Sequence, residues 1–213
     1  MSLPGHSAVA ATKALLERNS ELRSVRLHSK SGVIIGRLTE SGSVSLTYAA
    51  TEAVLVASKP VADAIRNYLC DALNICPSTC VEIAQTQFDT VVVLKEEAQV
   101  IGLEPDFDKL GSFPTRNVVV TARGVGNAAV FVARSFSPCL GVNEAAIDPS
   151  TFSYLASYWH VNLRKKKLTC VCGDEVHDLT LEGMGVQTVT VTGRANVLVD
   201  SVLKCNNFLP SMM

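Results

Sequence analysis

The stretch Arg134–Trp159, RSFSPCLGVNEAAIDPSTFSYLASYW, decides the fold. It reads as a short strand, a turn containing Pro and Gly, and a helix whose first residues are Asp148-Pro149-Ser150-Thr151. A helix that begins after a tight turn leaves its first backbone N–H groups unpaired and carries a partial positive charge at that end. Such a helix start commonly faces a carboxylate or a phosphate, so we expect an anion-binding feature there.

The same arrangement of a turn followed by a helix start occurs at the beginning of the chain, where Leu3-Pro4-Gly5-His6-Ser7 leads into another apolar helix. A shift of 143 positions places Gly5-His6-Ser7 on Asp148-Pro149-Ser150 and Leu15-Leu16 on Tyr158-Trp159. A fixed period of this kind predicts two copies of one structural unit. Three short alternating segments follow each helix: Ser24–Ser29, Val33–Leu38 and Val44–Ala49 in the first copy, and Lys167–Cys172, Val176–Leu181 and Gln187–Thr192 in the second.

The fold class that follows is α+β, with two pseudo-repeated units in which a curved, mostly antiparallel sheet wraps a central helix. We place the first unit at residues 1–102 and the second at residues 103–213. Only Met1–Gly5 precede the first helix, whereas strands and turns precede the second. We therefore expect the first unit to lack its leading strands and to expose a sheet edge, unless the chain starts upstream of Met1 or a partner chain or rearranged segment covers that edge.

The region between the two copies has a different sequence pattern. The dipeptide Lys59-Pro60 opens a segment with apolar residues at helical spacing, which predicts a helix. Gly124-Val125-Gly126-Asn127 joins two predicted strands instead of opening a helix, which favours a hairpin turn over a dinucleotide-binding loop. The other expected elements are a buried strand at Thr90–Leu94, hinge segments at Glu96–Gln99 and Glu104–Asp106, a short helix at Phe107–Leu110 and strands at Asn117–Thr121 and Ala129–Arg134.

Composition excludes several classes of protein. A hydrophobic content of 47% with a formal net charge of −1 is typical of an ordinary soluble globular protein. The run Lys165-Lys166-Lys167 falls at a predicted helix end, where solvated lysines are usual, so we expect no nucleic-acid partner. No apolar stretch approaches the roughly 18 to 20 residues that span a bilayer, so we expect no membrane association and a cytoplasmic location.

The chain has seven cysteines, an odd number without the spacing of a disulfide scaffold, which favours reduced thiols. Cys170 and Cys172 lie two apart on one predicted strand and therefore face the same side, and His177 follows on the next strand. No second ligand pair with suitable spacing follows, so buried thiols are favoured over a zinc site. We expect no bound metal.

Several motifs resemble those of the PhzF-like family, the phenazine-biosynthesis isomerases that share the diaminopimelate epimerase fold. Leu3–Ala8 is similar to the Leu-Cys-Gly-His-Ala-Thr start of the first family helix. Gly141–Trp159 is similar to the segment that opens the second, which begins Gly-Val-Asn-Glu and ends in a Tyr-Trp pair. Arg134–Pro138 resembles the family's Arg-x-Phe-x-Pro strand and Leu103–Asp106 its Leu-x-Pro-Asp hinge. The resemblance covers essentially the whole chain.

The resemblance implies an isomerase that shifts a proton on a small carboxylated metabolite in the cleft between the units, without a metal or other cofactor. It also suggests, as nothing else in the sequence does, a homodimer. In the family a glutamate takes a proton from carbon, while a His, an Asp and a Ser position and polarise the substrate. Matching positions give the catalytic candidates His6, Ser150 and Asp148 and the substrate-binding candidates Gly5, Ser7, Glu144 and Ser150.

The chain departs from the family pattern at three places. The family glutamate belongs to a segment upstream of the first helix, which this chain does not contain. In the ungapped register, which we favour, the family aspartate falls on Ala145, and the family Thr-Gly falls on Asp148-Pro149. Asp148 then places a negative charge where a substrate carboxylate should bind. A register with three residues inserted after Glu144 restores the aspartate as Asp148 and the serine as Ser153, and it stays open.

Two functions remain after these departures. The first is the isomerase that the resemblance implies. The second is a catalytically inactive relative, a pseudoenzyme that keeps the two-unit architecture as a small-molecule-binding or protein-interaction scaffold. The loss of proton-transferring groups favours the second, because acid–base catalysis falls by orders of magnitude without its acid or base.

Overall fold

The computed structural model describes residues 5–29, 32–50, 54–55, 59–86, 88–126, 129–183 and 188–196. No helix in these ranges is long and apolar enough to cross a bilayer. The helices are α1 (Gly5–Arg18), α2 (Lys59–Ala72), α3 (Glu97–Ile101), α4 (Phe107–Gly111) and α5 (Thr151–Leu163), with short 3-10 turns η1 (Pro77–Thr79) and η2 (Pro138–Leu140).

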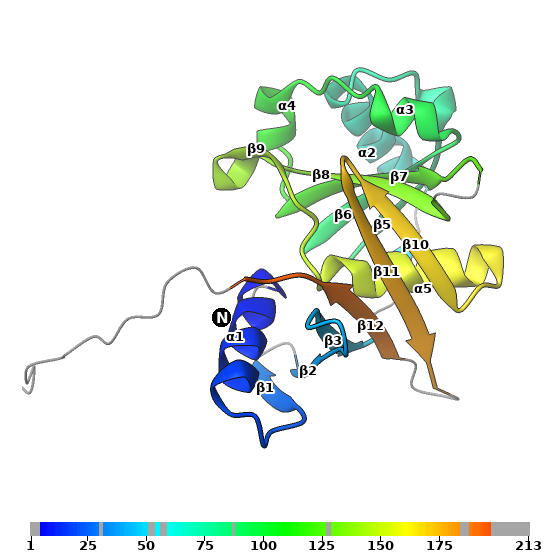
Figure 1. The fold of residues 1–213 in the computed structure, drawn as a ribbon. Helices are drawn as coiled ribbons and strands as arrows, with labels where there is room; N and C mark the ends of the chain where they lie inside the picture. The colour runs from blue at the N-terminus through cyan, green and yellow to red at the C-terminus, as the bar shows by residue number, and fades with distance from the viewer. Residues whose placement is uncertain are drawn as a thin grey trace, which may run out of the picture.

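The strands within these ranges form one sheet of twelve, with the order β1-β2-β3-β12-β11-β10-β8-β7-β6-β5-β4 and with β9 paired to β8 (Figure 1). The predicted α+β class is therefore confirmed. The strands are β1 (Val25–Ser29), β2 (Gly32–Leu38), β3 (Val44–Ala49), β4 (Val54–Leu55), β5 (Cys80–Gln85), β6 (Asp89–Leu94), β7 (Asn117–Arg123), β8 (Phe131–Ser137), β9 (Val142–Ala145), β10 (Lys167–Cys172), β11 (Glu175–Glu182) and β12 (Thr188–Gly193).

The repeat seen in the sequence is present in three dimensions. Helix α1 packs on β1–β3, and α5 packs on β10–β12. The hairpins β1–β2 and β10–β11 have the same register, since Ser29 pairs with Gly32 and Cys172 with Glu175. The copies join through antiparallel β3 and β12, where Thr47 lies opposite Thr190 and their hydroxyls are 3.0 Å apart. These two threonines are 143 residues apart, so the approximate twofold axis passes between them.

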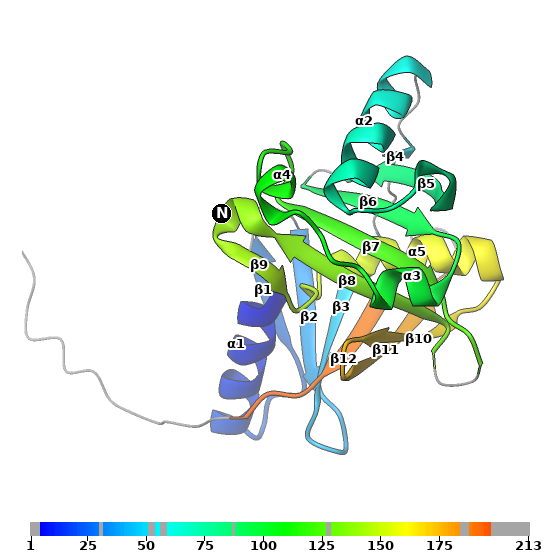
Figure 2. The ribbon, with the colours of Figure 1, turned by 90° about the horizontal axis from the view of Figure 1, so that it is seen from above.

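The central strands are buried on both faces, which explains their continuous apolar sequence. On β6, Val91 and Val93 pack into a cluster that also contains α5, whereas Val92 and Leu94 pack into a second cluster with residues of α2 and α4. The helices α2, α3 and α4 accordingly cover one face of β5–β8, and α5 lies against the other (Figures 1 and 2). The core therefore has two layers separated by the sheet.

The predicted unit boundary between residues 102 and 103 stays a prediction. Strand β6 pairs in parallel with β7 across it. The second hydrophobic cluster also takes residues from both sides, among them Leu69 and Leu73 before the boundary and Leu110 after it. Sheet and core are thus continuous at this point of the chain.

The two central helices differ in how far they are covered. Helix α1 buries Gly5, Ala8, Thr12 and Leu16 of its 14 residues, whereas α5 buries seven of 13. Strand β10 has β8 as a parallel neighbour, but β1 ends the sheet, and in the described part of the chain no strand lies on its outer edge. This asymmetry agrees with the expectation of an open edge in the first unit.

The sequence analysis did not predict strands β4, β5 (Cys80–Gln85) and β9, and one of its local predictions was wrong. Glu96–Gln99 is not a hinge: it begins α3 through a capping box in which the side chains of Glu96 and Gln99 each accept from the other's backbone N–H. The hairpin across Gly124 is confirmed by the antiparallel pairing of β7 and β8. Leu3, Pro4, Asn127 and Gln187 lie outside the described residues.

Candidate functional site

The starts of α1 and α5 meet at the carboxylate of Asp148. The backbone N–H of Gly5 donates to Asp148 Oδ2 over 2.7 Å, and His6 Nδ1 lies 3.6 Å from the same oxygen. The backbone N–H and the hydroxyl of Ser150 donate to Oδ1 over 2.8 and 2.6 Å. We call these four residues the helix-start junction. The structure therefore brings together residues from both copies of the repeated unit: Gly5 and His6 from the first, and Asp148 and Ser150 from the second.

The junction follows from the physics of helix starts. Two partial positive charges converge on one point, and a carboxylate stabilises both. The Asp148 side chain is only 19% exposed, so solvent screens these interactions weakly. Close approach needs a glycine, because a Cβ on Gly5 would lie 2.6 Å from Cδ of Pro149 and 2.8 Å from Asp148 Oδ1.

The His6 side chain is accessible to solvent beside the junction. It is 58% exposed, while Nδ1 lies 3.6 Å from the partly buried carboxylate of Asp148. Such an arrangement favours the tautomer with the proton on Nδ1 and leaves the Nε2 lone pair available. Ser7 is exposed in the first turn of α1, on the same helix start.

A tyrosine hydroxyl lies close to the junction in the interior. Tyr48, on β3, is buried, and its hydroxyl has no hydrogen-bond partner among the described residues. Burial, with a further contribution from the charge of Asp148, raises the pKa of Tyr48 above its ordinary value. The phenol therefore stays protonated and can donate a hydrogen bond.

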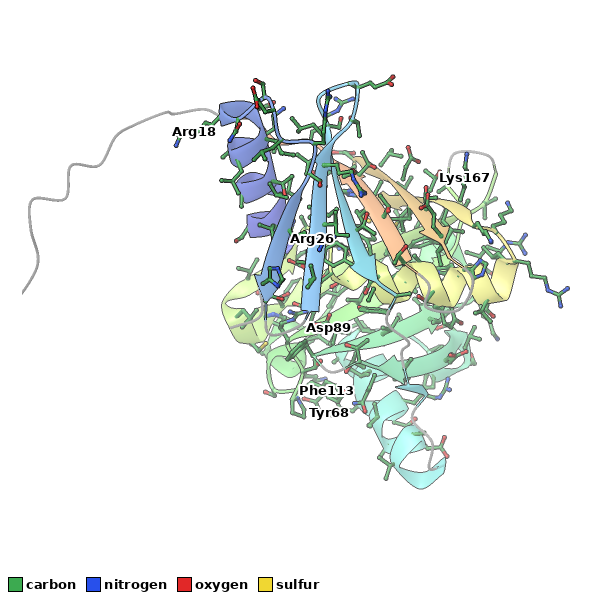
Figure 3. The ribbon with its side chains drawn as sticks, turned by 90° about the horizontal axis from the view of Figure 1, so that it is seen from below. Arg18, Arg26, Tyr68, Asp89, Phe113 and Lys167 are labelled. Atoms are coloured by element: carbon green, nitrogen blue, oxygen red, sulfur yellow. The ribbon has the colours of Figure 1, made fainter. Side chains whose placement is uncertain are left out.

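A buried polar cluster behind α5 was missed by the sequence analysis. The Asp89 carboxylate, with a side chain 2% exposed, accepts from Arg116 Nε and Nη2 over 2.8 and 2.7 Å and from Asn117 Nδ2 over 2.8 Å. Thr151, the first residue of α5, donates its hydroxyl to the same carboxylate over 3.2 Å. The cluster thus ties the start of α5 to the starts of β6 and β7. Figure 3 shows Asp89 in the interior, whereas Arg18 and Lys167 lie at the periphery.

The electrostatics of this cluster favour a charged pair. Burial works against the guanidinium, but the hydrogen bonds and charge of Asp89, and then the charge of Asp148, raise the pKa of Arg116 above its ordinary value. One sequence signal could have found the pair: an aspartate at the start of the apolar strand Asp89–Leu94 needs a buried partner. The sequence contains no signal for which cation supplies it.

Glu144, a predicted substrate contact, has a different partner. Its carboxylate accepts from Arg134 Nε and Nη2, each over 2.7 Å, between the paired strands β9 and β8. Arg134 Nη1 also donates to the carbonyl of Leu103 over 2.9 Å and to those of Val100 and Ile101. Arg134 therefore joins the two family-like motifs, strand and hinge, at the end of α3.

We expect Arg134→Lys to lower the free energy of unfolding by about 2 kcal/mol, because a lysine ammonium cannot make the two-pronged contact with Glu144 and also reach the carbonyl groups. Chemical denaturation measures the change. Arg26→Lys is the control, since Arg26 is exposed on β1, and it should leave the denaturation midpoint unchanged. Equal midpoints for Arg134→Lys and the unaltered protein would contradict this role.

The described cysteines include one close pair on strand β10. In the ranges that the structure describes, no group of three or more His, Cys, Asp or Glu side chains could hold a metal ion. Cys170 is buried in the core, as predicted, and Cys172 is partly buried beside it.

Comparison with known proteins identifies the family. The model of the family described as "Phenazine biosynthesis-like protein" (PhzC-PhzF) matches residues 1–200. The chain belongs to this family. Two uncharacterised isomerases of Pseudomonas aeruginosa are similar to it. One is 31% identical over 206 residues, which make up 94% of this chain and 72% of the relative. The other is 29% identical over 204 residues, which make up 95% of this chain and 73% of the relative.

Solved structures of the family share the fold. The structure of a PhzC/PhzF protein from Clostridium difficile superposes with a TM-score of 0.74 at 18% identity and covers 96% of this chain and 74% of that one. A PhzF-family protein from Enterococcus faecalis gives a TM-score of 0.72 at 24% identity, covering 93% and 72%. These neighbours confirm the diaminopimelate epimerase-like fold that the resemblance implied.

Proposed function

We propose that this member of the PhzF-like family is an isomerase that shifts a proton on a small carboxylated metabolite at the helix-start junction. One observation carries the proposal: the His6 imidazole lies 3.6 Å from the Asp148 carboxylate where two helix starts converge. An imidazole beside a carboxylate can serve as a general acid or base. The similarity to proteins named as isomerases supports the same class of reaction.

Each residue of the junction has a role in this proposal. His6 takes a proton from a substrate carbon through Nε2 and returns it to another carbon, while Asp148 holds the Nδ1–H and stabilises the imidazolium that forms. Ser150 fixes the orientation of Asp148 through two hydrogen bonds. The first four N–H groups of an α-helix have no partner within the helix, so those of His6 and Ser7 can receive the substrate carboxylate. No metal or other cofactor is needed.

A second candidate function rests on the same carboxylate. Both oxygens of Asp148 already accept hydrogen bonds from the protein, so an internal anion occupies the place that a substrate carboxylate would take between the helix starts. Ala145, which falls on the family aspartate in the ungapped register, lies on strand β9 and offers no acid or base. This observation favours a non-catalytic scaffold that binds a small molecule or a protein.

Proton exchange with solvent separates the two functions. The protein is incubated in deuterium oxide with a series of aliphatic and aromatic amino-carboxylates, and NMR follows deuterium incorporation at carbon. We expect His6→Gln and Asp148→Asn to lower the exchange rate by roughly 10²- to 10⁴-fold, the usual contribution of a general acid or base. His28→Gln is the matched control, because His28 is exposed on β1.

The outcomes are distinct. Exchange that survives His28→Gln but not His6→Gln supports the isomerase. Ligand-induced chemical-shift changes at Gly5–Ala8 and Asp148–Thr151 without exchange support the scaffold. No exchange and no shift with any member of the series contradicts both proposals.

A further inference from the structure

Cys170 and Cys172 form a close dithiol at the end of β10. They lie two residues apart on the same strand and project to the same face, and their sulfur atoms are 3.3 Å apart. Cys170 is completely buried, whereas Cys172 is partly exposed. The pair has no place in the proposed reaction at the helix-start junction.

A pocket of about 260 Å³ opens beside Cys172, the more exposed member of the pair. Its lining includes Cys172 and Gly173 together with Arg134, Glu144 and Ala146. A cavity of roughly 150 Å³ is enough to hold a benzene ring, so this pocket can accept a small organic group beside the Cys172 thiol.

The geometry disfavours a direct bond between the sulfurs. Residues two apart on a strand have Cα atoms about 6.6–6.8 Å apart, at the upper limit of the range that disulfides tolerate. Closing the sulfurs to about 2.05 Å would therefore bend β10, which is hydrogen-bonded to β8 and β11 on its two sides. A strained disulfide of this kind is easily reduced.

A single bridging atom fits the observed separation better. Bonds of about 2.3 Å from one atom to two sulfurs, at an angle near 90°, span about 3.3 Å, whereas a tetrahedral angle would need about 3.8 Å. An atom that binds two protein sulfurs at an angle near 90° is best matched by a pyramidal geometry with three ligands. The lack of a third protein ligand in the described part of the chain means that the remaining bond must come with the ligand.

We propose that Cys170 and Cys172 form a binding site for monosubstituted trivalent arsenicals, compounds in which one organic group occupies the third position on arsenic. Both S–H bonds and the arsenic–oxygen double bond break, two S–As bonds form, and the two thiol protons leave with the oxygen as water, so no oxidant or reductant is needed. The organic group then lies in the pocket beside Arg134 and Glu144. Burial raises the pKa of Cys170, so its thiol enters this exchange in the neutral form.

Phenylarsine oxide is the probe. The full chain, freshly reduced, is titrated with it, and intact mass spectrometry counts the adducts while a chromogenic disulfide counts the remaining accessible thiols. We expect one adduct per chain, which excess 2-mercaptoethanol leaves in place and 2,3-dimercaptopropanol removes. Cys172→Ala should weaken binding by roughly 10²- to 10⁴-fold, because the second sulfur no longer acts at high effective concentration.

Two further variants make the result decisive. Cys139→Ser, which removes an exposed thiol elsewhere, should leave the adduct unchanged. Cys170→Ser should behave like Cys172→Ala, and circular dichroism shows whether each variant is folded. An adduct that persists in folded Cys172→Ala would overturn the proposal and point to the other close pair, Cys70 and Cys80, which is buried. Formation of a Cys170–Cys172 disulfide by oxidised glutathione, with no arsenical adduct, would also overturn it.

Discussion

Replacing Asp89 by alanine is expected to lower the free energy of unfolding by about 3–5 kcal/mol, the usual effect of breaking a buried ion pair from one side. The substitution leaves the Arg116 guanidinium, with a side chain 29% exposed, without its counter-ion. It also leaves the donors of Asn117 and Thr151 without their acceptor. Chemical denaturation followed by circular dichroism measures the change.

The control for Asp89 is an ion pair of similar length at the surface. Lys109 Nζ lies 2.9 Å from Asp71, and both side chains are largely exposed, so Asp71→Ala should change the stability little. The double variant Asp89→Ala/Arg116→Ala should be less destabilised than the sum of the two single variants, because it removes the uncompensated charge. Additive losses would show that the two side chains do not act as a pair.

A second large effect is expected from Gly5→Ala. The added Cβ would lie 2.6 and 2.7 Å from Cδ and Cβ of Pro149, a ring that cannot rotate away. The starts of α1 and α5 must therefore separate, which removes the hydrogen bond from Gly5 N–H to Asp148 and shifts His6 away from the carboxylate. A displacement of about 1 Å at a reacting group can lower catalysis by roughly 10²-fold, and we expect a loss of that size in the deuterium-exchange assay.

We also expect Gly5→Ala to change the free energy of unfolding. Alanine is the better helix former, so helix propensity alone would stabilise α1. We expect instead a loss of about 2 kcal/mol from overpacking at the junction, measured by chemical denaturation. Gly193→Ala is the matched control, because no atom lies within 4 Å of a Cβ built there. A Gly5→Ala variant as stable and as active as the unaltered protein would show that the helix starts do not meet closely.

Much of the fold could be predicted because its signals are local. The apolar periodicity of α5, the Pro at the start of α2 and the alternation in β1–β3 and β10–β12 each depend on residues within one element. The repeat adds one long-range relation, because it predicts two equivalent helices, although α5 begins at Thr151, three residues after Asp148, the equivalent of Gly5 at the start of α1. Strand β5 was missed because its alternation is weak: Val81, between the buried Cys80 and the half-buried Glu82, is an exposed apolar residue.

The sequence by itself determined the repeat, the helix starts and the family, because these depend on residue types at fixed spacing. Only the tertiary structure decided which polar groups meet. Asp148 bonds to Gly5 across 143 residues, Asp89 to Arg116 across 27, and Glu144 to Arg134 instead of the helix starts. The physical reason is that a hydrophobic pattern is fixed by the geometry of one helix or strand, whereas the partner of a buried charge is selected by how distant elements pack.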